Sequence, residues 1–197
     1  MTMKMRRSWL LVLVLLVGCR SGASDAPSPG TVEGRRADPD QGCGALGATA
    51  AADPPPRARH DPATSRTIEA VGADLTTGPT VALDDLARRP EAYAGQRVRL
   101  EGLVTAMCVH RRAWFALRSP GNDQGANIRV VTAPAFLVPP GSTGRHARAE
   151  GTVELVEVSA EAARHYSRDH RLRDPGNPET AHRAVVLRAS GAEFFAP

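Results

Sequence analysis

The sequence predicts a mainly β fold for the second half of the chain, and three observations carry this prediction. Apolar and polar residues alternate with a period of two over residues 98–108 and 146–158, as in strands that bury one face. Each segment contains a central glycine, Gly102 or Gly151, which is common where a strand curves strongly. Residues 20–92 contain no Phe, Trp or Tyr, so we expect the aromatic residues of the core to come from the rest of the chain.

The first eighteen residues have the form of an export leader. Three positive residues, Lys4, Arg6 and Arg7, precede an apolar run over residues 9–17. This run is about nine residues long, whereas a helix that spans a bilayer needs roughly 20. We therefore interpret residues 1–18 as a signal peptide and not as a membrane anchor.

The leader ends in Leu16-Val17-Gly18-Cys19, which resembles the lipobox that the lipoprotein signal peptidase recognises. We expect Cys19 to be the acylated N-terminus of a bacterial lipoprotein, held by membrane lipid because each buried CH₂ contributes about 0.8 kcal/mol. The alternative is an ordinary signal peptide that ends at a buried cysteine. Arg20 stands where an acidic residue would favour retention in the inner membrane. We therefore expect a protein of the cell envelope, on the periplasmic side of the outer membrane.

The segment that follows is rich in Ala, Pro, Gly, Ser and Asp. Such a composition buries too little apolar surface to offset the entropy of ordering the chain, so residues 19–70 are predicted to be a disordered tether. Without the leader, the chain has 22 arginines against 21 acidic residues, a net charge of +1 instead of +4. The basicity of the whole chain is therefore no evidence for nucleic-acid binding.

Residues 72–197 are predicted to form one small domain. In chain order, we expect a short helical turn at 84–89 that ends at Pro90, strands at 98–109, 114–117 and 128–132, a fourth strand at 146–158, a short helix at 160–168 and a last strand at 184–188. Ser159 is the expected N-cap of the second helix. The alternation in the fourth strand slips near Leu155 and Val156, which predicts a β-bulge there.

Five strands in this order predict a small, partly open Greek-key barrel of the OB type, with one or two short helices. One feature departs from that fold. An OB barrel normally has its helix between the third and fourth strands, but residues 133–144 are rich in proline and the expected helix follows the fourth strand. An antiparallel sandwich is the alternative fold.

A resemblance to a known family covers about residues 72–195. The pieces that carry it are Leu83-Asp84-Asp85-Leu86, Pro90-Glu91-Ala92-Tyr93-Ala94-Gly95, Val98-Arg99-Leu100-Glu101-Gly102, Cys108 with Trp114, Phe136-Leu137-Val138-Pro139, and Arg164-His165-Tyr166. In this order and spacing they resemble the exported bacterial proteins grouped as domain of unknown function 4920. The resemblance implies an OB-like barrel and brings no established activity.

Members of that family typically have a second cysteine just before the tryptophan, where this chain has Ala113. A metal site in altered form would use Cys108, His110 and His165, because thiolate and imidazole ligands suit copper or zinc and three ligands are enough for an open site. The alternative is that Cys108 is a buried apolar thiol, His110 is solvated in a turn, and His165 lies at the edge of its helix. Cys43 in the tether leaves a disulfide to Cys108, or one between chains, as a further alternative.

Catalysis is not predicted, because the chain has no nucleophile elbow and no glycine-rich phosphate loop. Binding to nucleic acid is also not expected, since single-strand binders need a basic groove with exposed aromatic residues. The sequence therefore favours a monomeric, membrane-tethered lipoprotein without a cofactor, acting as a non-catalytic binding or scaffolding module with a protein partner in the cell envelope. The alternative function is soft-metal binding or a redox-related role through the degenerate Cys/His site.

Overall fold

The structure, a computed structural model, describes residues 36–37, 55–173 and 176–196 of the 197-residue chain. The predicted signal peptide at 1–18, the acylation site Cys19 and Cys43 lie outside these residues. Most of the predicted tether also lies outside them.

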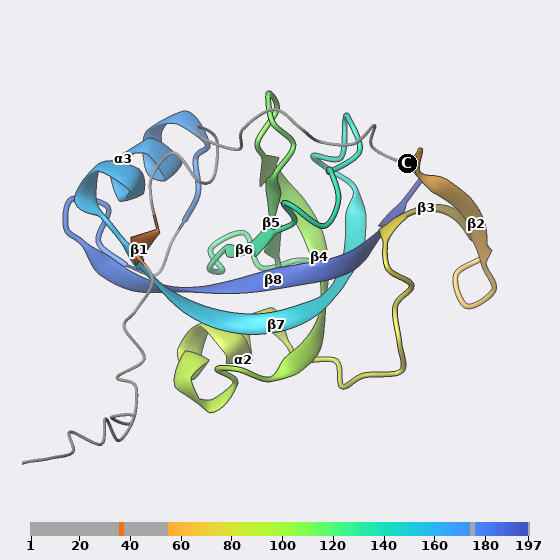
Figure 1. The fold of residues 1–197 in the computed structure, drawn as a ribbon, viewed down its shortest axis with the longest axis horizontal. Coiled ribbons are helices and arrows are strands. Elements are labelled where there is room, and N and C mark those ends of the chain that lie inside the picture. The colour runs from red at the N-terminus through yellow and green to blue at the C-terminus, as the bar shows by residue number, and fades with distance from the viewer. Residues whose placement is uncertain (1–35, 38–54, 174–175, 197) are drawn as a thin grey trace, which may run out of the picture. The chain divides into compact units, whose positions relative to one another are not determined.

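Five strands close into a barrel (Figure 1). They are β4 (Arg97–Met107), β5 (Trp114–Arg118), β6 (Ile128–Val131), β7 (His146–Val158) and β8 (His182–Phe195). Their order is β7-β4-β5-β6-β8, and pairing between β7 and β8 completes the circle. The β6–β8 pair is parallel and the other pairs are antiparallel. This is the strand order of an OB barrel, so the predicted fold class is confirmed.

A β-hairpin extends the sheet beyond the barrel. It consists of β2 (Arg57–Asp61) and β3 (Arg66–Gly72), and β3 pairs with the end of β8 from Ile68↔Phe195 to Gly72↔Gly191. This hairpin occupies the last part of the predicted tether, so the folded region begins before residue 70. Composition missed it because the hairpin gains its order from ladder hydrogen bonds to β8, with few large apolar side chains of its own. At the other edge, β1 (Arg36–Ala37) pairs with β7 in parallel.

In the described part of the chain, two short α-helices and one 3₁₀ turn complete the fold. The helix α2 (Leu83–Arg88) precedes the 3₁₀ turn η1 (Pro90–Ala92), and α3 (Ala160–Asp169) lies between β7 and β8. Leu86 of α2 packs into the barrel interior. Ser159 caps α3 as predicted, because its Oγ accepts a hydrogen bond from the backbone N–H of Ala162 at 3.1 Å. The helix therefore follows the fourth barrel strand, as the sequence indicated.

The predicted β-bulge at Leu155 and Val156 is wrong, and the reason is that the barrel strands have apolar contacts on both faces. The register of β7 with β8 is continuous from Gly151 to Val158. Leu155 packs against the cluster inside the barrel, whereas Val156 belongs to a second cluster on the outside, beneath α3. The register shift in this pair lies instead between Glu150 and Gly151.

The second cluster, called here the α3 cluster, explains a similar change of face in β4. A register shift between Val104 and Ala106 places Val104 inside the barrel and Ala106 outside it. The members of the α3 cluster are Ala106, Cys108, Trp114, Ala116, Val156, Val158, Ala162, Ala163, Tyr166, Leu172, Ala184 and Val186. The outer face of β5 and β6, which binds ligands in many OB proteins, is thus covered in part by the chain's own helix.

Candidate functional site: two outer faces of the barrel

The three residues predicted as metal ligands lie in different environments. Cys108 is 1% exposed and belongs to the α3 cluster, so the prediction that it is buried is confirmed. His110 is exposed near the tip of the β4–β5 hairpin, next to Val109, which is 71% exposed. His165 is on α3, where its Nδ1 lies 2.6 Å from Oδ2 of Asp169. Within the described part of the chain, no group of three or more His, Cys, Asp or Glu side chains is placed to hold a metal ion.

Aromatic rings fill the space between α3 and the barrel. The Trp114 ring is completely buried and meets Tyr166 and His170 edge to face, with ring centroids 5.7 Å and 4.7 Å away. His165 lies 5.0 Å from His170 between centroids. Burial and then the neighbouring His165 lower the pKa of His170, because both disfavour the imidazolium form. The geometry here is that of a packed apolar face with one neutral imidazole at its edge.

An arginine that the sequence did not single out lies on the same face. Arg129 on β6 is 9% exposed, and its guanidinium carbon lies 4.2 Å from the centroid of the Tyr166 ring. It stands opposite Ala116 on β5 and opposite Val186 on β8, and both of these residues are in the α3 cluster. The alternation of apolar and polar residues does not reveal that Arg129 is buried, because an exposed arginine on a strand would alternate with apolar residues in the same way.

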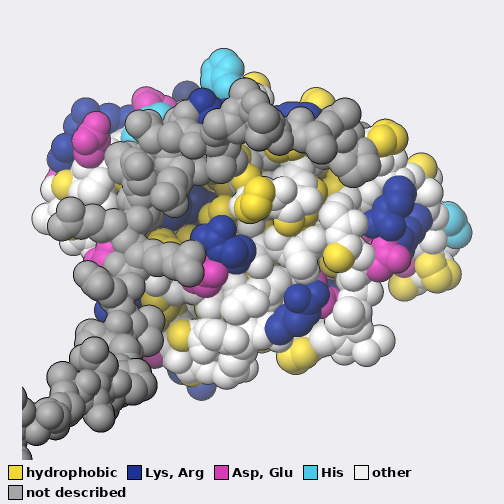
Figure 2. Space-filling view, in the orientation of Figure 1, with side chains coloured by type: hydrophobic (Ala, Val, Ile, Leu, Met, Phe, Trp, Pro, Cys, Tyr) yellow, Lys and Arg dark blue, Asp and Glu magenta, His cyan; other side chains and the backbone are white. Residues whose placement is uncertain are grey.

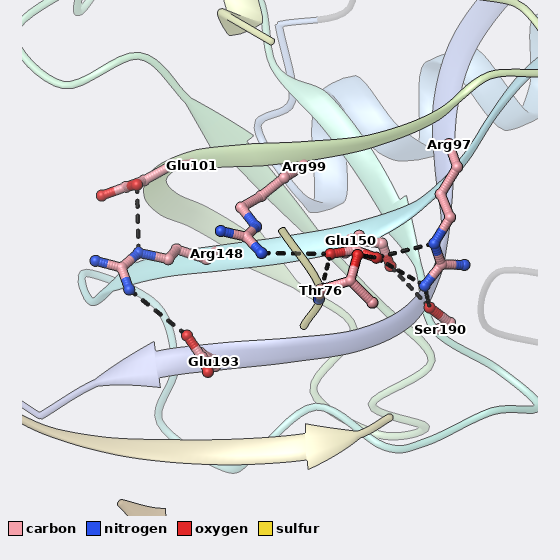
Figure 3. Close-up of polar contacts among 8 residues, drawn as sticks. All are labelled: Thr76, Arg97, Arg99, Glu101, Arg148, Glu150, Ser190 and Glu193. Atoms are coloured by element: carbon pink, nitrogen blue, oxygen red, sulfur yellow. Dashed lines mark hydrogen bonds and ion pairs between the residues drawn. The ribbon is translucent and has the colours of Figure 1, made fainter. Parts of the chain in front are cut away.

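A second polar group lies on the outer face of β4, β7 and β8 (Figure 3). Glu150 is at its centre, with a side chain that is 1% exposed. Its Oε2 accepts the backbone N–H of Thr76, and its Oε1 accepts the Thr76 hydroxyl and Nε of Arg97, all at 2.8 Å. Arg99 approaches Oε2 at 3.5 Å.

The hydrogen bonds of Glu150 decide its charge state. Burial alone would raise the pKa of this carboxyl, but the bonds from Thr76 and Arg97 outweigh burial and hold its pKa below the ordinary value. Glu150 is therefore an anion at neutral pH. It fixes the segment 73–81 to the barrel, because Thr76 belongs to that segment and the next part of it pairs with β4 through Thr80↔Arg99.

A similar group of charged residues surrounds Arg148 on the same face. Arg148 lies 3.2 Å from Asp61, 3.3 Å from Glu101 and 3.7 Å from Glu193, and its guanidinium stacks over the ring of Phe195 at 4.6 Å. Asp61 also accepts the hydroxyl of Thr64, and this bond is the first of those that lower its pKa. Arg148 thus joins the β2–β3 hairpin to β4 and β8, and the carboxylates of this face act as structural partners of arginines.

The comparisons with known proteins are sparse. No family model matches the sequence, and no characterised protein matches it. Among solved structures, a putative aspartyl-tRNA synthetase from Leishmania major Friedlin is similar with 15% identity and a TM-score of 0.36. The match covers 62% of this chain and 21% of that one, so the present chain spans about a fifth of the length of that protein. No helix in the described residues is long and apolar enough to cross a membrane.

Proposed function

We propose that this chain is a lipoprotein of the bacterial cell envelope, anchored through acylated Cys19 to the outer membrane on its periplasmic side. The observation that carries the proposal is the sequence Leu16-Val17-Gly18-Cys19 after a charged and then apolar leader. Two or more acyl chains at Cys19 are sufficient to hold the protein stably in the membrane. The family resemblance supports the same location, because its members are exported, and we propose that the chain is a relative of them.

The role proposed for the barrel is non-catalytic binding or scaffolding, with a protein or ligand of the envelope as partner. Two features of the structure support this role. The carboxylates around Glu150 and Arg148 are held in ion pairs with arginines, which leaves them poorly suited to proton transfer. Among the side chains that Figure 2 colours, basic and acidic ones lie beside one another in several separate places.

Nucleic acid is a less suitable partner for this barrel. Stacking of bases requires accessible aromatic rings, but Trp114 is completely buried and Tyr166 is 3% exposed. The soft-metal alternative has less support than the binding role, because the described residues around Cys108 include no set of three ligands. We therefore propose a binding module, with soft-metal binding through Cys108, His110 and His165 as the alternative.

The anchor is tested by expressing the full chain in a Gram-negative host and separating the membranes from the soluble fraction. We expect the unmodified chain to sediment with membranes, to stay there in high salt and to be released by detergent. Cys19→Ser should release the protein into the soluble periplasmic fraction, whereas Cys43→Ser should leave it on the membrane. Release by salt alone, or membrane attachment of Cys19→Ser, would contradict the proposal.

A further inference from the structure

The charge of Arg129 is enclosed by apolar neighbours without a carboxylate partner. Among the described residues, no Asp or Glu lies within ion-pair distance of its guanidinium, and none of its nitrogens makes a hydrogen bond. Four carboxylates of the surrounding elements have other basic partners: Glu154 contacts Arg188 at 2.9 Å, Asp123 contacts Arg118 at 3.0 Å, Asp169 contacts His165 at 2.6 Å, and Glu179 contacts Arg164 and Arg168 at 4.0 and 3.8 Å.

The head of Arg129 nevertheless reaches solvent. Some side-chain nitrogens of the described residues are fully enclosed and without a hydrogen-bond partner, among them Nε of Arg99, Nε1 of Trp114 and Nε of Arg118. Arg129 has no nitrogen of this kind, although the residue is only 9% exposed. Each guanidinium nitrogen therefore keeps a little contact with solvent at the rim of the α3 cluster, although about nine-tenths of the residue is enclosed.

Further donors lie beside Arg129 on the same outer face. The register Ala116↔Arg129 and Leu117↔Ile128 places Arg118 diagonally from Arg129, one strand away. Its Nη2 pairs with Asp123 at 3.0 Å, and its Nε is enclosed without a hydrogen-bond partner among the described residues, so Arg118 contributes positive charge to this face. Asn127, two residues before Arg129, has its Oδ1 3.4 Å from the hydroxyl of Thr105. This contact leaves the amide nitrogen of Asn127 as a donor on the same side of the sheet.

An arrangement of this kind favours an anionic ligand. A guanidinium that is largely removed from water is unfavourable without a counter-charge, and the face of the Tyr166 ring attracts the cation without neutralising it. The planar fork of arginine matches the two oxygens of a carboxylate or phosphate group. The fork of Arg129 would hold two oxygens of such a group, and the amide of Asn127 lies on the same face as a further donor.

We infer that the outer face formed by β5, β6 and α3 binds an oxyanion, either the phosphate or the carboxylate group of an envelope ligand, with Arg129 as its main contact. Asn127 supplies an additional hydrogen bond, and Arg118 adds positive charge nearby. The inference rests on the proposed binding role, to which it gives a ligand class. It does not depend on the lipid anchor, and the two are tested by different residues.

The test uses the full chain in an uncharged detergent, purified from whichever fraction of the host contains it. Sodium phosphate and sodium acetate are titrated at constant ionic strength against sodium chloride, with Trp114 fluorescence and the melting temperature as readouts. We expect a saturable fluorescence change and a rise in melting temperature with phosphate, acetate or both. The anion that gives the larger response shows whether the site prefers a phosphate or a carboxylate group. Chloride should give neither change, because one spherical ion matches the two parallel N–H groups of the fork less well than the paired oxygens of a carboxylate or phosphate do.

Two substitutions of Arg129 separate an anion site from a purely structural cation–π contact. Arg129→Met should weaken anion binding by about tenfold or more, since it removes charge-assisted hydrogen bonds, and should melt at or above the unmodified chain when phosphate and acetate are absent. Arg129→Lys should retain a weaker response, because it keeps the charge and loses the fork. The matched control, Arg183→Met, removes an exposed arginine that pairs with Glu157 and should leave the response unchanged.

Two results would overturn the inference. One is an unmodified chain that responds to phosphate and acetate no more than to chloride, and the other is an Arg129→Met variant that keeps the full response. Failure of this test leaves the behaviour of Cys19→Ser in membrane fractionation unchanged. A failed anchor likewise leaves the titration unchanged, so the two proposals fail separately.

Discussion

Replacing Glu150 by glutamine removes the charge of an enclosed carboxylate while keeping the size of the side chain. In the native protein, Oε1 accepts from Arg97 and Oε2 accepts from the backbone N–H of Thr76, both at 2.8 Å. An amide has one oxygen, so the NH₂ group of the new side chain would face at least one of these donors. Glu150→Gln therefore loses a charge-assisted hydrogen bond and weakens the attachment of the segment 73–81.

The size of the effect follows from the exposure of the partners. One hydrogen bond to a charged group contributes about 1.5–3 kcal/mol, and breaking a fully buried ion pair costs about 3–5 kcal/mol. The Arg97 side chain is 50% exposed, so water hydrates the arginine that is left and the cost falls below the range for a buried pair. We expect Glu150→Gln to lower the free energy of unfolding by about 2–3 kcal/mol, which corresponds to a fall of about 6–9 °C in melting temperature for a domain of this size.

Urea unfolding followed by Trp114 fluorescence measures this change, with Glu154→Gln as the matched control on the same strand. Glu154 pairs with Arg188 at 2.9 Å, and both side chains are partly exposed at 32% and 41%. An ion pair of that kind contributes about 0–1 kcal/mol, so the control should unfold near the native midpoint.

The pH dependence of the unfolding free energy shows whether the charge of Glu150 stabilises the folded protein. The pKa of Glu150 is lower in the folded protein than its ordinary value of 4.5, so the stabilisation is present above that value and is lost as pH falls through the folded pKa. The stability difference between the native chain and Glu150→Gln should thus be constant near neutral pH and shrink below about pH 4.5. A difference that stays the same from neutral to acidic pH, or a loss no larger than that of Glu154→Gln, would refute the reasoning.

Three further predictions concern single contacts. Ser159→Ala removes the N-cap of α3 and should cost about 1 kcal/mol in urea unfolding, whereas Ser159→Asp should keep most of the stability. Gly151→Ala should cost about 3 kcal/mol or prevent folding, because a Cβ at this position would meet the carbonyl oxygen of Arg188 and lie 2.7 Å from Cα of Ala189. Asp85→Asn should lower the pKa of Tyr93, which the hydrogen bond to Asp85 raises above its ordinary value of 10.0, and ultraviolet titration of tyrosinate measures the shift.

Each of these predictions has a control and a contrary outcome. Gly78→Ala is the control for Gly151→Ala, because a Cβ at Gly78 has no neighbour closer than 3.5 Å; equal stability of the two variants would show that the close approach of β7 and β8 is wrong. For Asp85→Asn, the titration is done with Tyr166→Phe in both chains so that Tyr93 alone is observed. An unchanged pKa of Tyr93 would mean that its hydrogen bond to Asp85 is absent in solution. If Ser159→Ala is as stable as the native chain, the hydrogen bond from Ala162 to Ser159 is absent in solution.

The barrel was predictable from sequence because its strands alternate locally. The period of two over residues 98–104 matches buried positions inside the barrel, and the central Gly151 lies where two backbones approach closely. Beyond Val104 the same pattern was misleading. Cys108 continues the alternation but lies outside the barrel, because the register shift near Ala106 exchanges the faces. A residue pattern along one strand does not show which side of the sheet a distant helix will cover.

The polar groups depended on contacts that are remote in sequence. Glu150 alternates with apolar residues as a solvated side chain would, yet the segment 73–81 buries it through Thr76, 74 residues away. Arg129 shows the same limit, because its enclosure depends on Tyr166 of α3. The β2–β3 hairpin was missed for a related reason, since its order comes from pairing with the last residues of β8. Local composition carries no signal for partners of this kind.

The mass of the mature N-terminus tests the central claim most directly. The protein is purified from the membranes of a bacterial host, and its N-terminal peptide is measured by mass spectrometry. The proposed function predicts a peptide that begins at Cys19 and carries a diacylglycerol on the thiol, with no peptide from residues 1–18. A peptide that begins elsewhere, or an unmodified Cys19 in an otherwise processed chain, would contradict it.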